Sequence, residues 1–185
     1  MKKILLAILL LAAMHSVSMA QSSAYSSDDN LLNLGIGVGT PFFGSGYSAS
    51  IPVNPTISYE KGITDAISVG AAASYARSSY SFSGFDSSAP YTIKETAIYV
   101  GARASYHLGG LLDLGSDVDL YGGISAGYVI VNVSDNQGGF AATASGAGYG
   151  LFAGGKYFFA PSVGVYAQIG YESLSYLNVG VAFKF

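Results

Sequence analysis

The chain has 185 residues, enough for one domain, and only 10% of them are charged, against roughly 25% in ordinary soluble domains. A mean hydropathy of +0.41 and an aromatic content of 14% exclude a disordered chain. Eight Lys and Arg residues and a net charge of −3 exclude a nucleic-acid-binding protein, and the lack of Cys excludes disulfides and thiolate metal sites. The composition is membrane-like, so the chain must contain segments that can span a membrane.

The first twenty residues have the pattern of a secretory signal peptide. Two lysines precede an apolar run over residues 4–14, and small residues stand at the positions that a signal peptidase recognises before a cleavage point after Ala20. The run is too short for a membrane-spanning helix, which needs ~20 residues. We therefore expect cleavage after Ala20, a short N-terminal segment over residues 21–30, and a single domain over residues 31–185.

Beyond the signal peptide, apolar residues recur at every second position, which is typical of strands with two different faces. No apolar run approaches the length of about eighteen residues that a spanning helix requires. Because every backbone N–H and C=O needs a partner in lipid, strands cross a membrane only as a closed barrel. Eight alternating segments can be counted: residues 32–40, 53–60, 66–77, 93–107, 118–132, 146–159, 163–171 and 176–185.

The connections between these segments alternate in length. Short turns follow the second and sixth segments, whereas residues 78–92 and 133–145 form longer connections. Transmembrane barrels have short periplasmic turns and longer outer loops, so with the N-terminus inside both long connections lie outside. Two connections fit this rule less well, because residues 107–117 are long for a periplasmic turn and residues 172–175 are short for an outer loop.

The second face of the segments decides which side points outward. A water-exposed exterior, as in a secreted lipocalin-like barrel, needs many charged residues, but this face consists mostly of Gly, Ser and Ala. Small residues suit the narrow interior of an eight-stranded barrel. We therefore expect an all-β fold: an eight-stranded antiparallel up-and-down transmembrane β-barrel with its apolar face toward lipid. Aromatic residues gather at segment ends, as interfacial girdles require: Tyr59, Tyr106, Tyr157, Phe159, Phe183 and Phe185 at the inner ends, and Tyr75, Tyr128 and Tyr171 at the outer ends.

The last segment is amphipathic and ends in Phe, with Leu177, Val179, Val181, Phe183 and Phe185 at alternate positions. It resembles the assembly signal of bacterial outer-membrane proteins. Together with the stretches SYEKGITDAISVG (58–70) and LFAGGKYFFAPSVG (151–164), it makes the chain similar to the small outer-membrane β-barrel domain family, the OmpA/OmpX-like barrels of Gram-negative bacteria. The resemblance implies a porin-like fold in the outer membrane, the barrel-assembly machinery as a partner during biogenesis, and contact with outer-membrane lipid and lipopolysaccharide. It implies no activity.

Five charged residues fall on the small-residue face, in the half of the barrel nearer the periplasm. Two acids and three bases confined to a narrow lumen should pair, because isolated buried charge is costly. Such a cluster would plug the barrel, and aqueous channels use ~16–18 strands. The residues are Glu60, Arg103, Asp119, Lys156 and Lys184, with Arg103 expected at the centre and Glu60 and Asp119 as its partners.

Other candidate sites are weaker. One stretch matches the spacing of a phosphate-binding loop, but Tyr157 stands where Ser or Thr would hold Mg²⁺. His107 falls at an inner strand end, far from the outer leaflet, so a structural role is favoured over a catalytic triad. Asp113, Asp117 and Asp119 are interpreted as polar turn residues rather than a Ca²⁺ site, which needs 6–8 oxygen ligands. We predict no catalytic, cofactor-binding or metal site.

Three functions remain open. The leading one is a non-enzymatic, monomeric outer-membrane barrel with an envelope-structural or surface-interaction role. The second is a narrow channel for small solutes or ions, and the third is a lipid-modifying enzyme, which needs His, Ser and a carboxylate at the outer rim. For the first, exposed aromatic residues in the outer loops could form a contact patch for an unidentified surface ligand: Phe42, Phe43, Tyr47, Tyr80, Phe82, Phe85, Tyr91 and Phe140.

Overall fold

The computed structural model describes residues 23–39, 54–82, 91–172 and 174–185. Its strands form one closed antiparallel barrel in which sequence neighbours are spatial neighbours, and β1 pairs with β8 to close it. The predicted eight-stranded up-and-down barrel is thus confirmed. The strands are β1 (Asn30–Val38), β2 (Asn54–Thr64), β3 (Ile67–Phe82), β4 (Tyr91–His107), β5 (Val118–Asp135), β6 (Ala141–Ala160), β7 (Val163–Glu172) and β8 (Ser175–Lys184).

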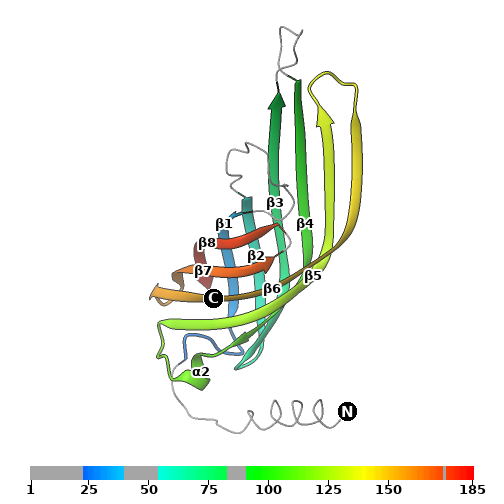
Figure 1. Cartoon of the computed structure of the whole chain (residues 1–185). Helices are drawn as coiled ribbons and strands as arrows, with labels where there is room; N and C mark the ends of the chain where they lie inside the picture. Colours follow the sequence, from blue (N-terminus) through cyan, green and yellow to red (C-terminus); the bar gives the residue numbers. More distant parts are fainter. Residues whose placement is uncertain (1–22, 40–53, 83–90, 173) are drawn as a thin grey trace, which may run out of the picture.

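One short helix, α2 (Gly109–Leu112), lies in the connection between β4 and β5 (Figure 1). The end of the barrel that carries α2 and the short β2–β3 and β6–β7 turns is called the inner end below, and the opposite end the outer end. Within the described ranges, no helix is long and apolar enough to span a membrane. The predicted signal peptide lies outside these ranges and stays a prediction.

Each strand alternates between an outward face and a lumen face. Outward aliphatic side chains are widely exposed, with Ile124 at 61% and Leu151 at 69%. In the lumen, small residues leave room for tyrosine rings, and a Cβ on Gly101 or Gly148 would collide with the ring of Tyr99. A belt of exposed aliphatic side chains around a barrel with a filled interior requires lipid rather than water as its surroundings.

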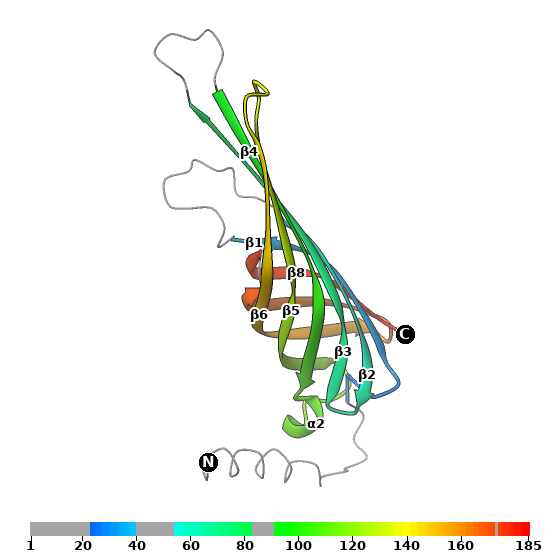
Figure 2. The same ribbon diagram turned by 90° about the vertical axis from the view of Figure 1, so that its right-hand side faces the viewer.

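Strands β3 to β6 are much longer than the other four. They have 16, 17, 18 and 20 residues, against 9 to 11 in β1, β2, β7 and β8. Their outer parts rise beyond the rest of the barrel as a four-stranded sheet (Figures 1 and 2). We call this sheet the outer wall and define it as residues 75–82 of β3, 91–98 of β4, 130–135 of β5 and 141–149 of β6.

The outer wall has two edges without a neighbouring strand among the described residues. The pairing of β2 with β3 reaches only Ser74, and the pairing of β6 with β7 begins at Gly150. The outer parts of β3 and β6 therefore leave backbone donors and acceptors unpaired on one side. Such edges can accept another extended chain.

The polarity of the two faces is exchanged at the base of the outer wall. Toward the inner end the outward face is apolar and the lumen face is polar or small. One step further out, the outward face becomes polar, while the inward face carries Ile93, Val131 and Val133. The change occurs between two neighbouring rows of paired residues: Tyr75, Ile98, Ile130 and Ser145 form the inner row, and Arg77, Thr96, Asn132 and Thr143 form the outer row.

This exchange explains why the predicted strand ends are wrong on this side of the barrel. A search for outward-facing apolar residues stops where the outward face becomes polar, although the strands continue. Residues 78–82, 91–92, 133–135 and 141–145 of the predicted outer connections belong to strands, and residues 136–140 connect β5 to β6. Tyr80, Phe82 and Tyr91 consequently belong to strands and not to loops.

Candidate functional site

The centre of the lumen holds Arg103, which lies between two carboxylates. Its Nε lies 3.1 Å from Glu60 Oε1, its Nη1 donates to Glu172 Oε1 at 3.2 Å, and its Nη2 donates to Gln168 Oε1 at 3.1 Å. The guanidinium carbon lies 4.2 Å from the centroid of the Phe152 ring. Because Arg103 is 5% and Glu60 is 0% exposed, side chains from β2, β4, β6 and β7 close the lumen at this level.

Asp119 does not pair with Arg103, so that expected partner is wrong. Asp119 Oδ2 instead accepts from Lys156 Nζ at 3.1 Å, and Asp119 Oδ1 lies 2.9 Å from His107 Nδ1. Lys156 Nζ also lies 3.8 Å from the centroid of the Tyr121 ring. The second partner of Arg103 is Glu172, which the sequence analysis placed in an outer connection but which ends β7 with its side chain turned inward.

Lys184 has a different neighbourhood from the other four charged residues. Its Nζ donates to the backbone oxygen of Ala24 at 2.8 Å and lies 4.8 Å from the centroid of the Phe158 ring. No ion pair to Lys184 occurs in the part of the chain that the structure describes. This lysine therefore ties the N-terminal segment to the last strand and does not share the acids of the cluster.

The N-terminal segment closes the inner mouth of the barrel. Tyr25, only 1% exposed, stacks on the ring of His107 with 3.5 Å between ring centroids and 10° between the ring planes. Its hydroxyl donates to the backbone oxygens of Thr64 at 3.1 Å and Ile67 at 2.7 Å. Burial raises the pKa of the Tyr25 phenol. The lumen is thus closed at two levels, by Arg103 in the middle and by Tyr25 at the inner end.

Three residues near the inner end, Ser68, His107 and Asp119, are linked to one another in the sequence Ser–His–Asp that is typical of a hydrolytic triad. Ser68 Oγ lies 2.9 Å from His107 Nε2, and His107 Nδ1 lies 2.9 Å from Asp119 Oδ1. However, Ser68 is fully buried, and its hydroxyl also donates to Glu60 Oε2 at 2.9 Å, an oxygen that accepts from Ser105 as well. A nucleophile needs room for a substrate carbonyl, and these contacts leave none. The three residues instead extend the hydrogen-bonded network between the two closed levels.

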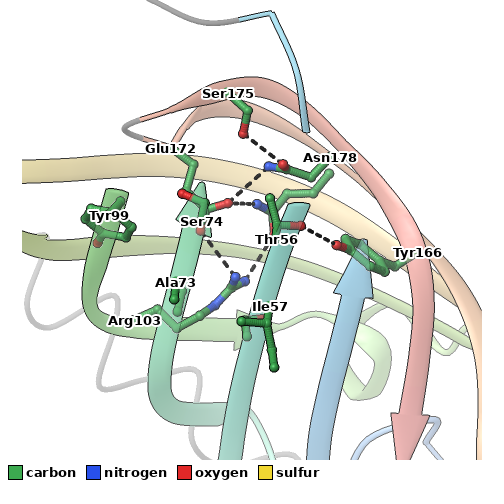
Figure 3. Close-up of a pocket in the computed structure, with 13 residues that line it drawn as sticks. Thr56, Ile57, Ala73, Ser74, Tyr99, Arg103, Tyr166, Glu172, Ser175 and Asn178 are labelled. Carbon is green, nitrogen blue, oxygen red and sulfur yellow. Dashed lines mark hydrogen bonds and ion pairs between the residues drawn. The ribbon is translucent and has the colours of Figure 1, made fainter. Parts of the chain in front are cut away.

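A polar hollow lies on the outer side of Arg103 (Figure 3). Its volume of about 20 Å³, measured as the space open to the centre of a water molecule, holds about one water molecule. Ser74 Oγ lines the hollow and has no hydrogen-bond partner in the described part of the chain. Around its walls, Tyr166 and Thr56 hydroxyls lie 3.3 Å apart and Asn178 Nδ2 donates to Glu172 Oε2 at 3.1 Å. The hollow suits bound water and ends at the Arg103–Glu60 pair.

The predicted contact patch is only partly within the described residues, whereas all residues of the predicted assembly signal are described. Phe42, Phe43, Tyr47 and Phe85 lie outside the described residues, Tyr80, Phe82 and Tyr91 lie on strands, and Phe140, 53% exposed, lies between β5 and β6. The residues of the predicted assembly signal occupy the outward positions of β8 and the residue after it: Leu177, Val179, Val181, Phe183 and Phe185.

Comparison with known proteins bears on this barrel as a whole. The family model for the outer membrane protein beta-barrel domain matches residues 6–185. The chain belongs to this family. The exposed aliphatic belt of this outer-membrane barrel therefore faces the lipid of a bacterial outer membrane.

Two solved structures have a similar fold. The outer membrane protein OprG from Pseudomonas aeruginosa is 13% identical with a TM-score of 0.54, and the match covers 87% of this chain and 97% of OprG. The attachment invasion locus protein Ail of Yersinia pestis, in complex with the heparin analogue sucrose octasulfate, is 18% identical with a TM-score of 0.50, covering 85% and 98%. No curated protein sequence matches the chain. Similarity at these identities concerns the fold alone.

Proposed function

We propose that this outer-membrane barrel is a non-enzymatic surface protein that passes no solutes and makes its contacts through the outer wall. The observation that carries the proposal is the difference in strand length: the wall continues past the level at which its outward face becomes polar. This sheet has a polar outward face, an inward face that carries Ile93, Val131 and Val133, and two edges without a partner strand among the described residues, and it extends beyond the lipid-facing aliphatic belt. Sheet edges and apolar faces of this kind are used to bind extended chains and partner surfaces.

The filled lumen supports the non-conducting part of the proposal. A solute would have to displace both the Arg103–Glu60 pair and the Tyr25 ring. The hollow above Arg103 has room for about one water and is closed below it. The absence of substrate room beside Ser68 supports the non-enzymatic part.

Planar-bilayer recording on the full-length mature protein tests whether the barrel conducts. The two closed levels lead us to expect no steady single-channel steps for the wild-type protein. Steady, ohmic steps would contradict the proposal and would favour the alternative of a narrow channel for small solutes or ions.

Site-specific photo-crosslinking in intact cells tests the role of the outer wall. A photo-crosslinking amino acid is placed at Ser79 or Thr143, both exposed in the wall, and at Ile169 as a lipid-facing control that is 64% exposed. We expect adducts with proteins or surface saccharides at the wall positions and lipid adducts alone at Ile169. Lipid adducts alone at all three positions would contradict a surface-interaction role.

A further inference from the structure

The cationic residues of this chain are few and unevenly placed. Of the eight Lys and Arg residues, two lie in the predicted signal peptide and three have lumen positions. Lys61 is exposed near the inner end of β2. The remaining two, Arg77 and Lys94, both lie in the outer wall. The outer half of the described barrel therefore has its outward positive charge in one place.

Arg77 and Lys94 are neighbours on the same face. Arg77 pairs with Thr96, and Lys94 pairs with Ser79, so the two cations are diagonal neighbours across β3 and β4. Diagonal positions on one face are about 7–8 Å apart. Both side chains are exposed and point away from the lumen, because the alternate residues Ala76 and Ala97 are fully buried on the inward side. Their long stems allow both charged groups to reach one anion.

Charge is segregated across the wall. Its two carboxylates, Glu95 and Asp135, stand at inward positions, and the outward positions of the described wall hold no acid. No ion pair to Arg77 or Lys94 is formed within the described ranges. The outward face of the wall thus presents uncompensated positive charge on a chain whose net charge is negative.

The position of the two cations along the barrel axis indicates which part of the membrane lies beside them. The row just inward of Arg77 contains Tyr75 and Ile98, which continue the lipid-facing belt, whereas the row of Arg77 itself is polar. Basic side chains at such a boundary extend toward lipid headgroups while their stems stay in contact with apolar surface. Thr96 and Asn132 in the same row add hydrogen-bonding groups. Arg77 consequently lies at headgroup height beside the lipid, and Lys94, which is in the next row outward opposite Ser79, is placed to contact the same headgroups from further out.

We propose that Arg77 and Lys94 form a binding site for a phosphate group on the saccharide headgroup of outer-leaflet lipopolysaccharide. The guanidinium of Arg77 offers paired donors that fit phosphate oxygens, and the Lys94 ammonium adds a second positive charge. The inference rests on the proposed orientation of the wall toward the outside. It assigns the wall a lateral contact with lipid in addition to its contacts through edges and inward face.

The test compares lipopolysaccharide binding by variants of the full-length mature protein. Detergent-solubilised lipopolysaccharide is titrated against wild-type protein, the double variant Arg77→Gln/Lys94→Gln, and Lys61→Gln as a control cation near the opposite membrane face. We expect the Kd to rise about tenfold in the double variant, since two exposed ionic contacts are lost, and to stay unchanged in Lys61→Gln. With enzymatically dephosphorylated lipopolysaccharide, the double variant and wild type should bind equally.

Three results would overturn the inference. The first is an unchanged Kd in the double variant, the second is an equal loss in Lys61→Gln, and the third is a difference that persists with the dephosphorylated lipid. Inorganic phosphate is titrated separately, and a loss confined to this arm would assign the cations to soluble anions instead. Heat-dependent gel mobility reports folding, and if the double variant does not fold, each single variant is expected to weaken binding about threefold. Failure here leaves the conductance and crosslinking tests of the proposed function unaffected.

Discussion

The four long strands contribute both to the closed barrel around the inner half of the lumen, which all eight strands enclose, and to the outer wall, but the two regions are stabilised by different means. In the lumen every strand has two neighbours, and the charged side chains of Glu60, Asp119 and Lys156 are at most 1% exposed and ion-paired. In the wall, β3 and β6 each have an edge without a partner strand in the described part of the chain, and several residues on both faces are partly exposed. Stability is therefore concentrated where the barrel is closed, and not simply where the strands are long. We therefore expect substitutions to affect unfolding in the lumen and binding in the wall.

The largest effect on stability is expected for Arg103→Ala. Removing the guanidinium leaves Glu60 and Glu172 without their cation in the lumen, and breaking a buried pair destabilises by about 3–5 kcal/mol. Urea unfolding in lipid should show a much lower midpoint. Ala104→Gly on the outward side of the same strand is the control, and equal shifts in both variants would contradict the inward assignment of Arg103.

A smaller effect on the free energy of unfolding is expected for Tyr25→Phe at the inner mouth. The variant keeps the stacking on His107 but loses the hydroxyl that donates to Thr64 and Ile67, a loss of about 1 kcal/mol. Urea unfolding in lipid measures this loss as well. Tyr157→Phe is the matched control, because the Tyr157 side chain is 53% exposed. A neutral Tyr25→Phe would mean that the N-terminal segment does not stay closed over the lumen.

In the wall, Thr143→Ala should change stability by no more than about 0.5 kcal/mol. Thr143 is exposed, and within the described ranges its hydroxyl donates to the exposed Asn132 side chain at 2.8 Å and to no other group. Native-state hydrogen exchange gives a second measurement, since amides in residues 75–82 of β3 should exchange faster than those in residues 67–74. Uniform protection along β3 would remove the distinction between wall and barrel.

The smallest expected effect concerns Ser68. Because its hydroxyl is buried and shared with Glu60, a fluorophosphonate probe should not label the folded protein above the level of Ser68→Ala. Specific labelling of Ser68 would show that the inner mouth opens enough to admit a reagent. The inner mouth would then not be the closed part of the molecule.

The alternation of apolar and small residues alone predicts the barrel and most of the lumen face. Odd and even positions of a strand point to opposite sides, so one inward residue identifies the others. The same alternation assigns Glu172 and His107 to the lumen, since they continue the alternate positions of Gln168 and Arg103. The sequence analysis missed Glu172 because it ended the seventh segment at residue 171. It favoured a structural role for His107, which the structure confirms, but did not include it in the lumen cluster. Which charged side chains form pairs depends on the register offset between neighbouring strands, and the alternation within one strand does not give this offset.

The outer wall was harder to predict for a different reason. Its strands keep a period of two but exchange the polarity of their faces, so a pattern that defines strands by outward apolar residues ends at Tyr75 and Ile98. The N-terminal closure by Tyr25 could not be predicted either, because it depends on the geometry of the inner mouth formed by residues distant in sequence.

The seam between β1 and β8 has a consequence for how the barrel forms. Leu31 is opposite Lys184, and Asn30 and Phe185 exchange two backbone hydrogen bonds beside them. The other seven strand pairs are hairpins that can form locally, whereas this one joins the first strand to the last. The entropic cost of closing a loop grows with the logarithm of its length. Pairing the first strand with the last therefore costs only about 2.4 kcal/mol more than closing a ten-residue loop, because the loop length doubles about four times between the two. The β1–β8 pair is instead expected to form slowly, because pairing between residues distant in sequence occurs late in folding. Until then both terminal strands have open edges, and the unclosed sheet needs an external partner to shield them.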